Sequence, residues 1–273
     1  MTPEVLFSLT GKTALVTGGA TGIGLMAVQG LMAAGAHVLI ASRKGEACSA
    51  VATDLNALGL PGTADGFAGD VGSDAGVTAL TAEVSSRTDK LHILMNNAGS
   101  TWGAPIGDFP HQAWEKVMSV NVAGLFQLTQ ALLPMLKSAA TPEDPARVVN
   151  VGSVMGEVPM GDGAYSYAAS KAAVHHLTQI LAKELAGDAI TVNALAPGPF
   201  VSKMTAFATA DPDRRDKVGQ GVPLGRVGRP EDIAACLQFL CGAGGSYITG
   251  AIIPVSGGIN VMTGPSLFER AFT

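Results

Sequence analysis

Along almost the whole chain, short segments with the hydrophobic pattern of β-strands alternate with longer segments of helical periodicity. The first strand-like run, residues 13–17, leads through a glycine-rich turn into apolar residues at helical spacing from Ile23 to Ala34. Strands that are separated by helices pair in parallel, and right-handed crossovers then cover both faces of the sheet with helices. The alternation therefore predicts an α/β fold with a doubly wound, Rossmann-like parallel sheet.

The expected elements follow one another without a linker or a charge run that would divide the chain. Further strands are predicted at residues 37–41, 63–68, 91–95, 147–151, 190–194 and 251–255, and helices at residues 46–58, 74–87, 111–137, 165–186 and 230–241. We expect a single domain over residues 1–273, because a sheet of this kind commonly uses such a length as one unit. Residues 197–229 lack a strong sheet pattern and follow the sixth strand, where ligands bind in such folds, so we expect a substrate lid there.

Charge and composition argue against several kinds of partner. The net charge is −5 and lysine and arginine are not clustered, which disfavours DNA or RNA. Cys48, Cys236 and Cys241 have no metal-ligand spacing, so we expect reduced, buried thiols and no metal site. The apolar stretches look strand-sized or broken and no secretory signal opens the chain, which predicts no membrane partner and a cytoplasmic location. The 47% of hydrophobic residues favours an oligomer.

The turn after the first strand has its glycines in the order GxxxGxG over residues 18–24. Such glycines let the backbone approach a pyrophosphate and let the helix begin close to the sheet, with its N-terminal N–H groups facing the anion. A glycine-rich turn without a ligand is the alternative, but the position at the start of a βαβ series favours a dinucleotide. The residues expected to contact the cofactor here are Gly18, Thr21, Gly22, Ile23 and Gly24.

The end of the second strand indicates which dinucleotide binds. An acidic residue there would bond the adenosine ribose hydroxyls and repel a 2′-phosphate, but the sequence reads Ala41, Ser42, Arg43 and Lys44. Arg43 can pair with a 2′-phosphate through two hydrogen bonds, Ser42 can donate to it, and Lys44 adds positive potential. We therefore expect NADP(H). A solvated basic start of the next helix is the alternative, and Thr21, where many NADP-preferring proteins carry a basic residue, leaves dual specificity open.

Tyr167 and Lys171 are four residues apart, so they lie on one face of the predicted helix. A free tyrosine has a pKa of about 10 and is a poor base at neutral pH unless its phenolate is stabilised, as a nearby lysine and an oxidised nicotinamide would do. Ser153 follows the fifth strand, where its hydroxyl could bond a substrate oxygen. Asn121, flanked by valines in an apolar helix, needs a buried partner. Each of these features has an alternative interpretation when it is taken alone. The spacing of Tyr167 and Lys171 can arise by chance, Ser153 can be an ordinary loop serine, and Asn121 can be purely structural.

The sequence resembles the short-chain dehydrogenase/reductase family over about residues 8–260. The resemblance rests on motifs that follow one another in the family's order: TGGATGIG (17–24), Asp70-Val71, NNAG (96–99), Asn121, Ser153, YAASK (167–171), Pro197-Gly198 and RPED (229–232). Within the family, residues 96–106, 141–153 and 197–204 look most like the rhamnolipid-associated 3-oxoacyl-[acyl-carrier-protein] reductases.

The resemblance implies roles for individual residues. Tyr167 would be the acid/base, Lys171 would lower its pKa and bind the nicotinamide ribose, Ser153 would orient the carbonyl, and Asn121 would hold a water in a proton relay. Tyr165 is a rival to Tyr167, but Ala169 stands four residues after it. The remaining cofactor contacts implied by the resemblance are Asp70 and Val71 at the adenine, Asn97, Ala98 and Gly99 behind the cofactor, and Pro197, Gly198, Phe200 and Ser202 at the carboxamide.

Two departures from the family pattern concern the substrate side. Ser256 stands where relatives usually have Asp, and Ser153 lies one residue farther from Tyr167 than in many 3-oxoacyl reductases. The extra residue falls in the loop over residues 155–163, which should border the substrate. Apolar and flexible residues gather in the sequence around the predicted site, although packing is the better interpretation for any one of them: Trp102, Met155, Met160, Phe200, Met204 and Phe207.

We therefore expect NADPH-dependent reduction of a ketone, a 3-oxoacyl thioester or another hydrophobic ketone. An NADP-linked alcohol or hydroxysteroid dehydrogenase and a non-catalytic NADP-binding protein are the alternatives. The resemblance also implies a homodimer or homotetramer packed through the long helices and the C-terminal helix and strand. We expect the tail, residues 263–273, to cover a neighbouring subunit. His175 and His176, beyond Lys171, are interpreted as packing or interface residues.

Overall fold

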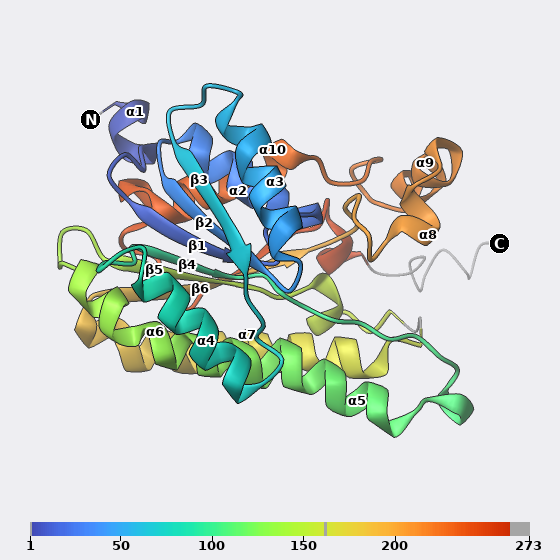
Figure 1. Ribbon diagram of the computed structural model, residues 1–273. Helices are drawn as coiled ribbons and strands as arrows, with labels where there is room; N and C mark the ends of the chain where they lie inside the picture. Colours follow the sequence, from blue (N-terminus) through green and yellow to red (C-terminus); the bar gives the residue numbers. More distant parts are fainter. Residues whose placement is uncertain (1, 161–162, 263–273) are drawn as a thin grey trace.

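Seven parallel strands form one sheet in the part of the chain that the computed structural model describes, residues 2–160 and 163–262. The order across the sheet is β3-β2-β1-β4-β5-β6-β7 (Figure 1). The strands are β1 (Thr13–Thr17), β2 (His37–Ser42), β3 (Thr63–Ala68), β4 (Ile93–Asn96), β5 (Ala146–Val151), β6 (Ile190–Pro197) and β7 (Ile252–Val255). The chain reverses its direction of winding between β1 and β4, where parallel sheets of this kind bind ligands. The doubly wound, Rossmann-like fold is thereby confirmed.

Helices cover both faces of this sheet (Figure 1). Leu15 and Val16 show why two cores form, since neighbouring strand residues point to opposite faces and these two belong to different hydrophobic clusters. The cluster with Val16 also contains residues of α2, α3 and α10, and the cluster with Leu15 contains residues of α4, α6 and α7. The helices are α2 (Gly22–Ala33), α3 (Gly45–Asn56), α4 (Asp74–Ser85), α5 (His111–Met118), α6 (Leu125–Ala139), α7 (Tyr165–Leu185) and α10 (Pro230–Cys241).

Short elements that the sequence pattern did not predict complete the described fold. They are too short to show a periodicity of their own. They comprise the helices α1 (Pro3–Phe7), α8 (Ala206–Thr209) and α9 (Pro212–Gln220) and 3₁₀ turns at Ile106–Asp108, Val154–Gly156, Ala186–Asp188, Ala243–Gly245 and Ile259–Val261. Among the predicted elements, β6 ends at Pro197 instead of residue 194, because its pairing with β7 continues through that proline.

The helix predicted over residues 111–137 is divided into α5 and α6 by a π-helical turn, Ser119–Gly124. A Cβ atom at Gly124 would lie 2.0 Å from the carbonyl oxygen of Val71, so the turn is in close contact with the segment that follows β3. Single π turns inside helices often occur at functional sites, because they change the direction in which a side chain points. Here the turn contains Asn121.

The combined stretch His111–Ala139 meets, by length and composition alone, the criterion for a membrane-crossing helix, with a mean hydropathy of 1.2. The prediction that no apolar stretch reaches that length is therefore wrong for this helix. Its apolar side chains are nevertheless used inside the protein, because Leu128, Leu132 and Leu136 are fully buried in the cluster shared with α4 and α7. α6 is a helix of the protein core.

Residues 198–229, which we call the β6–α10 segment, leave the sheet after β6 and return to it at α10. Phe200 and Gly228 pair as an isolated bridge at the base of this segment. Arg226 then holds Asp232, in the first turn of α10, through two hydrogen bonds of 2.6 and 2.9 Å. The same aspartate accepts a hydrogen bond from the backbone N–H of Arg229 (2.8 Å) and so fixes the start of α10.

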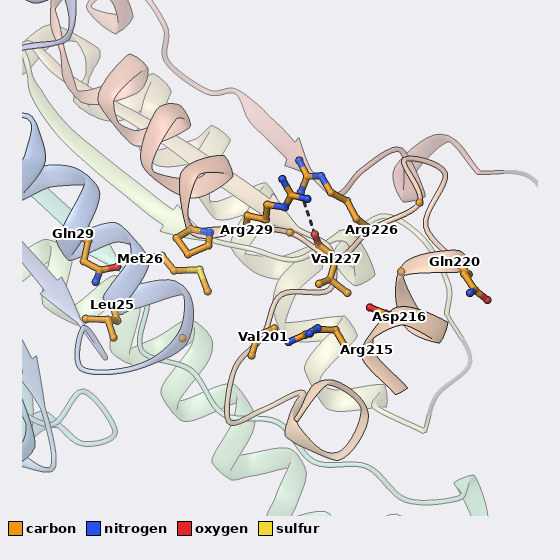
Figure 2. A pocket seen from close by; sticks show the side chains of 15 residues that line it. Leu25, Met26, Gln29, Val201, Arg215, Asp216, Gln220, Arg226, Val227 and Arg229 are labelled. Atoms are coloured by element: carbon orange, nitrogen blue, oxygen red, sulfur yellow. Dashed lines mark hydrogen bonds between the residues drawn. The ribbon is translucent and has the colours of Figure 1, made fainter. Parts of the chain in front are cut away.

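A groove of about 860 Å³ separates the β6–α10 segment from α2. Figure 2 shows Met26 and Gln29 of α2 on one wall, and Arg215 and Asp216 of α9 across from them. Gly22, in the predicted pyrophosphate turn, also lines the groove, so the groove opens beside the cofactor end of the sheet.

We predict that Gly66→Ala lowers the free energy of unfolding by about 1 to 3 kcal/mol, the usual cost of overpacking. Gly66 lies in β3, and a Cβ atom there would come within 2.1 Å of the Cys48 backbone in α3. Urea denaturation measures the change. Gly187→Ala is the control, because a Cβ atom at Gly187 meets nothing within 4 Å. Equal stability of the Gly66→Ala variant and the unsubstituted protein would contradict this account of the contact.

Candidate active site

Lys171 and Tyr167 lie at the N-terminal end of α7, beside the carboxyl end of β5. The Lys171 ammonium donates a hydrogen bond to the carbonyl oxygen of Val151 (2.7 Å) and lies 5.5 Å from the centre of the Tyr167 ring. Lys171 is only 5% exposed, and this burial lowers its pKa from 10.5 to about 8. The predicted pair is therefore brought together, and its lysine is held by the last residue of a core strand.

Ser153 follows β5 by two residues and begins the 3₁₀ turn Val154–Gly156. Its hydroxyl accepts a hydrogen bond from the backbone N–H of Met155 (3.2 Å) and also bonds to the side chain of Tyr167. Burial raises the pKa of Tyr167, while the hydrogen bond from Ser153 lowers it. The hydrogen bond from Ser153 therefore favours the phenolate, and Lys171, which stays protonated at neutral pH with a pKa of about 8, adds positive charge beside the ring.

Asn121 is 2% exposed, and the buried partners that its position required are present. Its Oδ1 accepts from the backbone N–H of Ser100 (2.7 Å), and its Nδ2 donates to the Ser100 carbonyl (2.9 Å) and to Ser170 Oγ (2.9 Å). Ser170 Oγ in turn donates to the carbonyl of Tyr167 (2.7 Å). Asn121 thus connects the π turn to the first turn of α7. Ser100 and Ser170 were not expected from the sequence, although Ser170 lies inside the YAASK motif.

The glycine-rich turn is tightly folded against β4. Gly18 and Gly22 have φ angles of +66° and +56°, which favour glycine, and a Cβ atom at Gly24 would lie 2.4 Å from the Gly18 carbonyl oxygen. Asn97 Nδ2 donates to the carbonyls of Thr17 (2.8 Å) and Gly18 (3.2 Å). Side chains at these glycines would collide with Asn97, Ser202 and the backbone of the turn itself, so glycine allows the tight turn that brings the start of α2 to the edge of the sheet, as a dinucleotide site requires. Thr21 and Ile23 flank the start of α2, at its N-cap and in its first turn.

A pocket of about 210 Å³ lies between the ends of β1, β2 and β4. The predicted cofactor residues Gly18, Ser42, Arg43, Asp70, Val71, Ala98 and Gly99 line it. Lys44 does not line it and instead forms the N-cap of α3. Lys116 and Val120 also line it and were not identified from the sequence, although both lie within five residues of Asn121. Apart from Lys44, the residues expected at the adenosine and its 2′-phosphate therefore surround one cavity.

Pro197 ends β6 next to β7, and Gly198 follows it. The Gly198 N–H donates to the Val255 carbonyl (3.0 Å), and a Cβ atom at Gly198 would lie 2.9 Å from Ser256 Cα. The Ser256 hydroxyl, at the position where relatives carry Asp, donates to Asn260 (2.8 Å). A Cβ atom at Gly22 would lie 3.0 Å from the Ser202 Cβ, which places Ser202 against the pyrophosphate turn.

The apolar residues expected around the substrate divide into two groups. Phe200 is 2% exposed and its ring packs against Gly228, so this side chain belongs to the core. Met155 and Met160 pack against a small buried cluster formed by Val154, Val222 and Ile259. The exposed members are Trp102, Met204 and Phe207, at 47%, 40% and 79%. Of the loop over residues 155–163, Gly161 and Asp162 lie outside the described residues, as does the tail from 263 to 273.

Tyr165, the rival tyrosine, begins α7 and packs edge-on against Phe109, with 5.5 Å between the ring centres. Its ring therefore takes part in a surface aromatic contact instead of facing Lys171. Cys48 and Cys241 are buried thiols, and Cys236 is partly exposed. In the described ranges, no group of three or more His, Cys, Asp or Glu side chains is arranged to hold a metal ion.

Known proteins are similar to this chain along most of its length. The sequence model of the short chain dehydrogenase family matches residues 12–213. The rhamnolipids biosynthesis 3-oxoacyl-[acyl-carrier-protein] reductase of Pseudomonas aeruginosa is 47% identical over 255 residues, which cover 93% of this chain and 98% of the relative. A tropinone reductase homolog of Arabidopsis thaliana is 36% identical over 262 residues, which cover 96% of this chain and 97% of the relative.

A solved structure extends the likeness to three dimensions. The Pseudomonas aeruginosa RhlG/NADP active-site complex is 46% identical to this chain and superposes on it with a TM-score of 0.90. The match covers 95% of this chain and all of the solved chain. The resemblance inferred from the motifs, including the narrower resemblance to rhamnolipid-associated 3-oxoacyl reductases, is confirmed.

We predict that Lys171→Met raises the free energy of unfolding at pH 7 by about 2 kcal/mol. A pKa lowered from 10.5 to about 8 corresponds to roughly 3 kcal/mol of lost stability, and losing the hydrogen bond to Val151 offsets about 1 kcal/mol of the gain. As the pH rises from about 8 to 10.5, the folded lysine becomes neutral before the unfolded one, so the difference should shrink.

Urea denaturation at pH 7 and pH 10 measures this difference between Lys171→Met and the unsubstituted protein. Lys183→Met is the matched control, because Lys183 is an exposed lysine of the same helix. A Lys171→Met variant that is less stable at pH 7, or whose stability gain persists unchanged at pH 10, would show that the buried ammonium of Lys171 does not lower the free energy of unfolding.

Proposed function

Because this chain belongs to the short-chain dehydrogenase/reductase family, we propose that it reduces a 3-oxoacyl thioester, or a similarly hydrophobic ketone, to a secondary alcohol with NADPH. The observation that carries the proposal is the meeting of Ser153, Tyr167 and Lys171 at the carboxyl end of β5. A hydroxyl, a phenol and an ammonium in this order can orient a carbonyl, protonate its oxygen and stabilise the charge that develops.

The proton chemistry favours the direction of reduction. Burial raises the pKa of Tyr167, so the phenol keeps its proton at neutral pH and is ready to donate it. NADPH, when bound, supplies the hydride that the carbonyl carbon receives. The carbonyl oxygen then takes the Tyr167 proton while Ser153 holds that oxygen by a hydrogen bond, which balances the addition of one hydride and one proton. Lys171 stabilises the resulting phenolate until it is protonated again.

The choice of NADPH rests on the adenosine pocket. Ser42 and Arg43 line it at the end of β2, and no carboxylate stands at that end. The solved relative with a TM-score of 0.90 is an NADP complex, and a 3-oxoacyl (acyl-carrier-protein) reductase of Agrobacterium tumefaciens with NADP bound matches with a TM-score of 0.84 at 33% identity. These observations support NADP(H) as the cofactor of this chain.

The substrate class rests on the relatives and on the exposed apolar side chains. The relative with 47% identity is described as a 3-oxoacyl-[acyl-carrier-protein] reductase. Trp102, Met204 and Phe207 are exposed, and Met204 and Phe207 lie in the β6–α10 segment. We propose that residues 197–229 act as a lid that brings Met204 and Phe207 into contact with an acyl chain. A single catalytic domain, a homodimer or homotetramer, and a cytoplasmic location stay predictions.

We predict that Tyr167→Phe lowers turnover of acetoacetyl-CoA with NADPH by about 10³-fold, since general acid catalysis contributes about 10² to 10⁴. The decrease of NADPH absorbance measures the reaction. Tyr165→Phe is the matched control and should keep nearly full activity, because its ring packs on Phe109. If the unsubstituted protein binds NADPH tightly but turns over no member of a panel of ketones, the proposed reaction is wrong.

We also predict that Arg43→Ala weakens NADPH binding by about 10- to 100-fold, as expected for a charge-assisted hydrogen bond worth roughly 1.5 to 3 kcal/mol. NADH binding should change little, because NADH has no 2′-phosphate. Fluorescence titration measures both. Lys44→Ala is the control, since Lys44 does not line the pocket. An equal loss for both cofactors would mean that Arg43 does not recognise the 2′-phosphate.

A further inference from the structure

His175 occupies an unusual place beneath the loop that carries Ser153. It lies on α7 one turn beyond Lys171, and it is only 7% exposed. A Cβ atom at Gly152 would lie 2.1 Å from His175 Nε2, and one at Gly156 would lie 2.9 Å from His175 Cε1. The two glycines therefore allow the backbone before and after Ser153 to close directly on the imidazole ring.

The contacts of the two ring nitrogens indicate which of them carries the proton. The backbone N–H of Ser153 points to His175 Nε2 at 3.4 Å, so Nε2 serves as an acceptor. On the other side of the ring, Nδ1 lies 3.6 Å from Glu157 Oε1. Nδ1 has no hydrogen-bond partner, so a neutral imidazole with its proton on Nδ1 turns that proton toward the carboxylate and leaves the lone pair of Nε2 for the amide.

Two neighbouring side chains of α7 hold consecutive parts of the same segment. Lys171 bonds the carbonyl of Val151, and His175 bonds the N–H of Ser153, two residues further along. Only Gly152 separates the Val151 carbonyl from the Ser153 N–H, so these two hydrogen bonds hold the backbone that carries the Ser153 hydroxyl. The position of this hydroxyl relative to Tyr167 therefore depends on this segment. A displacement of this hydroxyl by about 1 Å can cost up to roughly 100-fold in rate.

We propose that neutral His175 is a positioning residue that holds Ser153 in its productive place, and that protonation of His175 releases it and slows the enzyme. The inference rests on the proposed reductase activity and adds a pH-sensitive support to its site. A protonated imidazole carries a hydrogen on Nε2, which would face the Ser153 N–H, and two donors repel each other at this distance.

The charges around His175 favour the neutral form at neutral pH. Burial is the largest influence and lowers its pKa below 6.5, and the positive charge of Lys171 lowers it further, whereas Glu157 raises it. Lys171 on α7 and Glu157 in the loop after the 3₁₀ turn are the charged groups that face the ring among the described residues. Activity should therefore be full near pH 7 and fall as the pH drops through the pKa of His175.

The first test compares His175→Gln and His175→Leu by kcat at saturating ketone and NADPH. Gln can place an amide oxygen near the position of Nε2, so His175→Gln should keep most of the activity. Leu offers no acceptor, and His175→Leu should lose about 10-fold or more in kcat with NADPH affinity unchanged. His176→Gln is the matched control, because His176 is the exposed neighbour on the same helix.

The second test is the pH profile of kcat from pH 5 to pH 8, with circular dichroism recorded over the same range. The unsubstituted protein should lose activity on the acidic side while it stays folded, and His175→Gln should lack this acidic decline because Gln does not titrate. Glu157→Gln should move the decline to lower pH, since the carboxylate raises the pKa of His175. A merely structural histidine would change stability but not the shape of this profile.

Several results would overturn the proposal. These are an acidic decline that persists in His175→Gln, the absence of any decline in the folded, unsubstituted protein, and full kcat in His175→Leu. If the unsubstituted protein reduces no ketone at any pH although it binds NADPH, the proposed function fails first. The two failures are thus distinguishable, because the tests of His175 require an active enzyme as their reference.

Discussion

All strands of the described sheet run in the same direction, so each delivers its carboxyl end to one edge. Near that edge, polar side chains lie within an otherwise apolar core and are joined by buried hydrogen bonds. Asn96 at the end of β4 donates to Asn150 of β5 (2.9 Å) and to Thr129 of α6 (3.0 Å), and Asn150 donates to Thr178 of α7 (2.9 Å). Because buried polar groups are costly when unpaired, this network fixes how α6 and α7 sit on the strands. Tyr167 and Lys171 lie on α7, so their position depends on this network.

Burial has opposite consequences for the two groups that would handle the proton. It lowers the pKa of Lys171, which makes the ammonium costly to keep, and it raises the pKa of Tyr167, which keeps the phenol protonated. Both changes arise from the same low-dielectric surroundings. The same burial therefore lowers the stability of the fold and keeps the Tyr167 phenol protonated at neutral pH, as is common where pKa values are adjusted for catalysis.

At three places, a glycine allows a segment of the candidate site to come into close backbone contact with a neighbouring element. Gly24 lets α2 begin against the pyrophosphate turn, Gly124 lets the π turn touch Val71, and Gly152 lets the loop with Ser153 close on His175. Each contact connects a segment that faces the ligand to an element of the core. The β6–α10 segment differs, because Phe200 and the Arg226–Asp232 pair anchor its two ends while Phe207 between them is exposed.

The amino-acid sequence was sufficient to predict the parallel sheet, the family, the four candidate catalytic positions and half of the residues that line the candidate adenosine pocket. These depend on periodicity and on motif spacing, which are local and can be read along the chain. The surroundings of these residues became apparent only from the folded chain. The π turn at Asn121, the partners Ser100 and Ser170, the burial of Phe200 and the place of His175 all result from contacts between residues far apart in sequence. No local pattern encodes such contacts, because they arise only when helices and strands pack together.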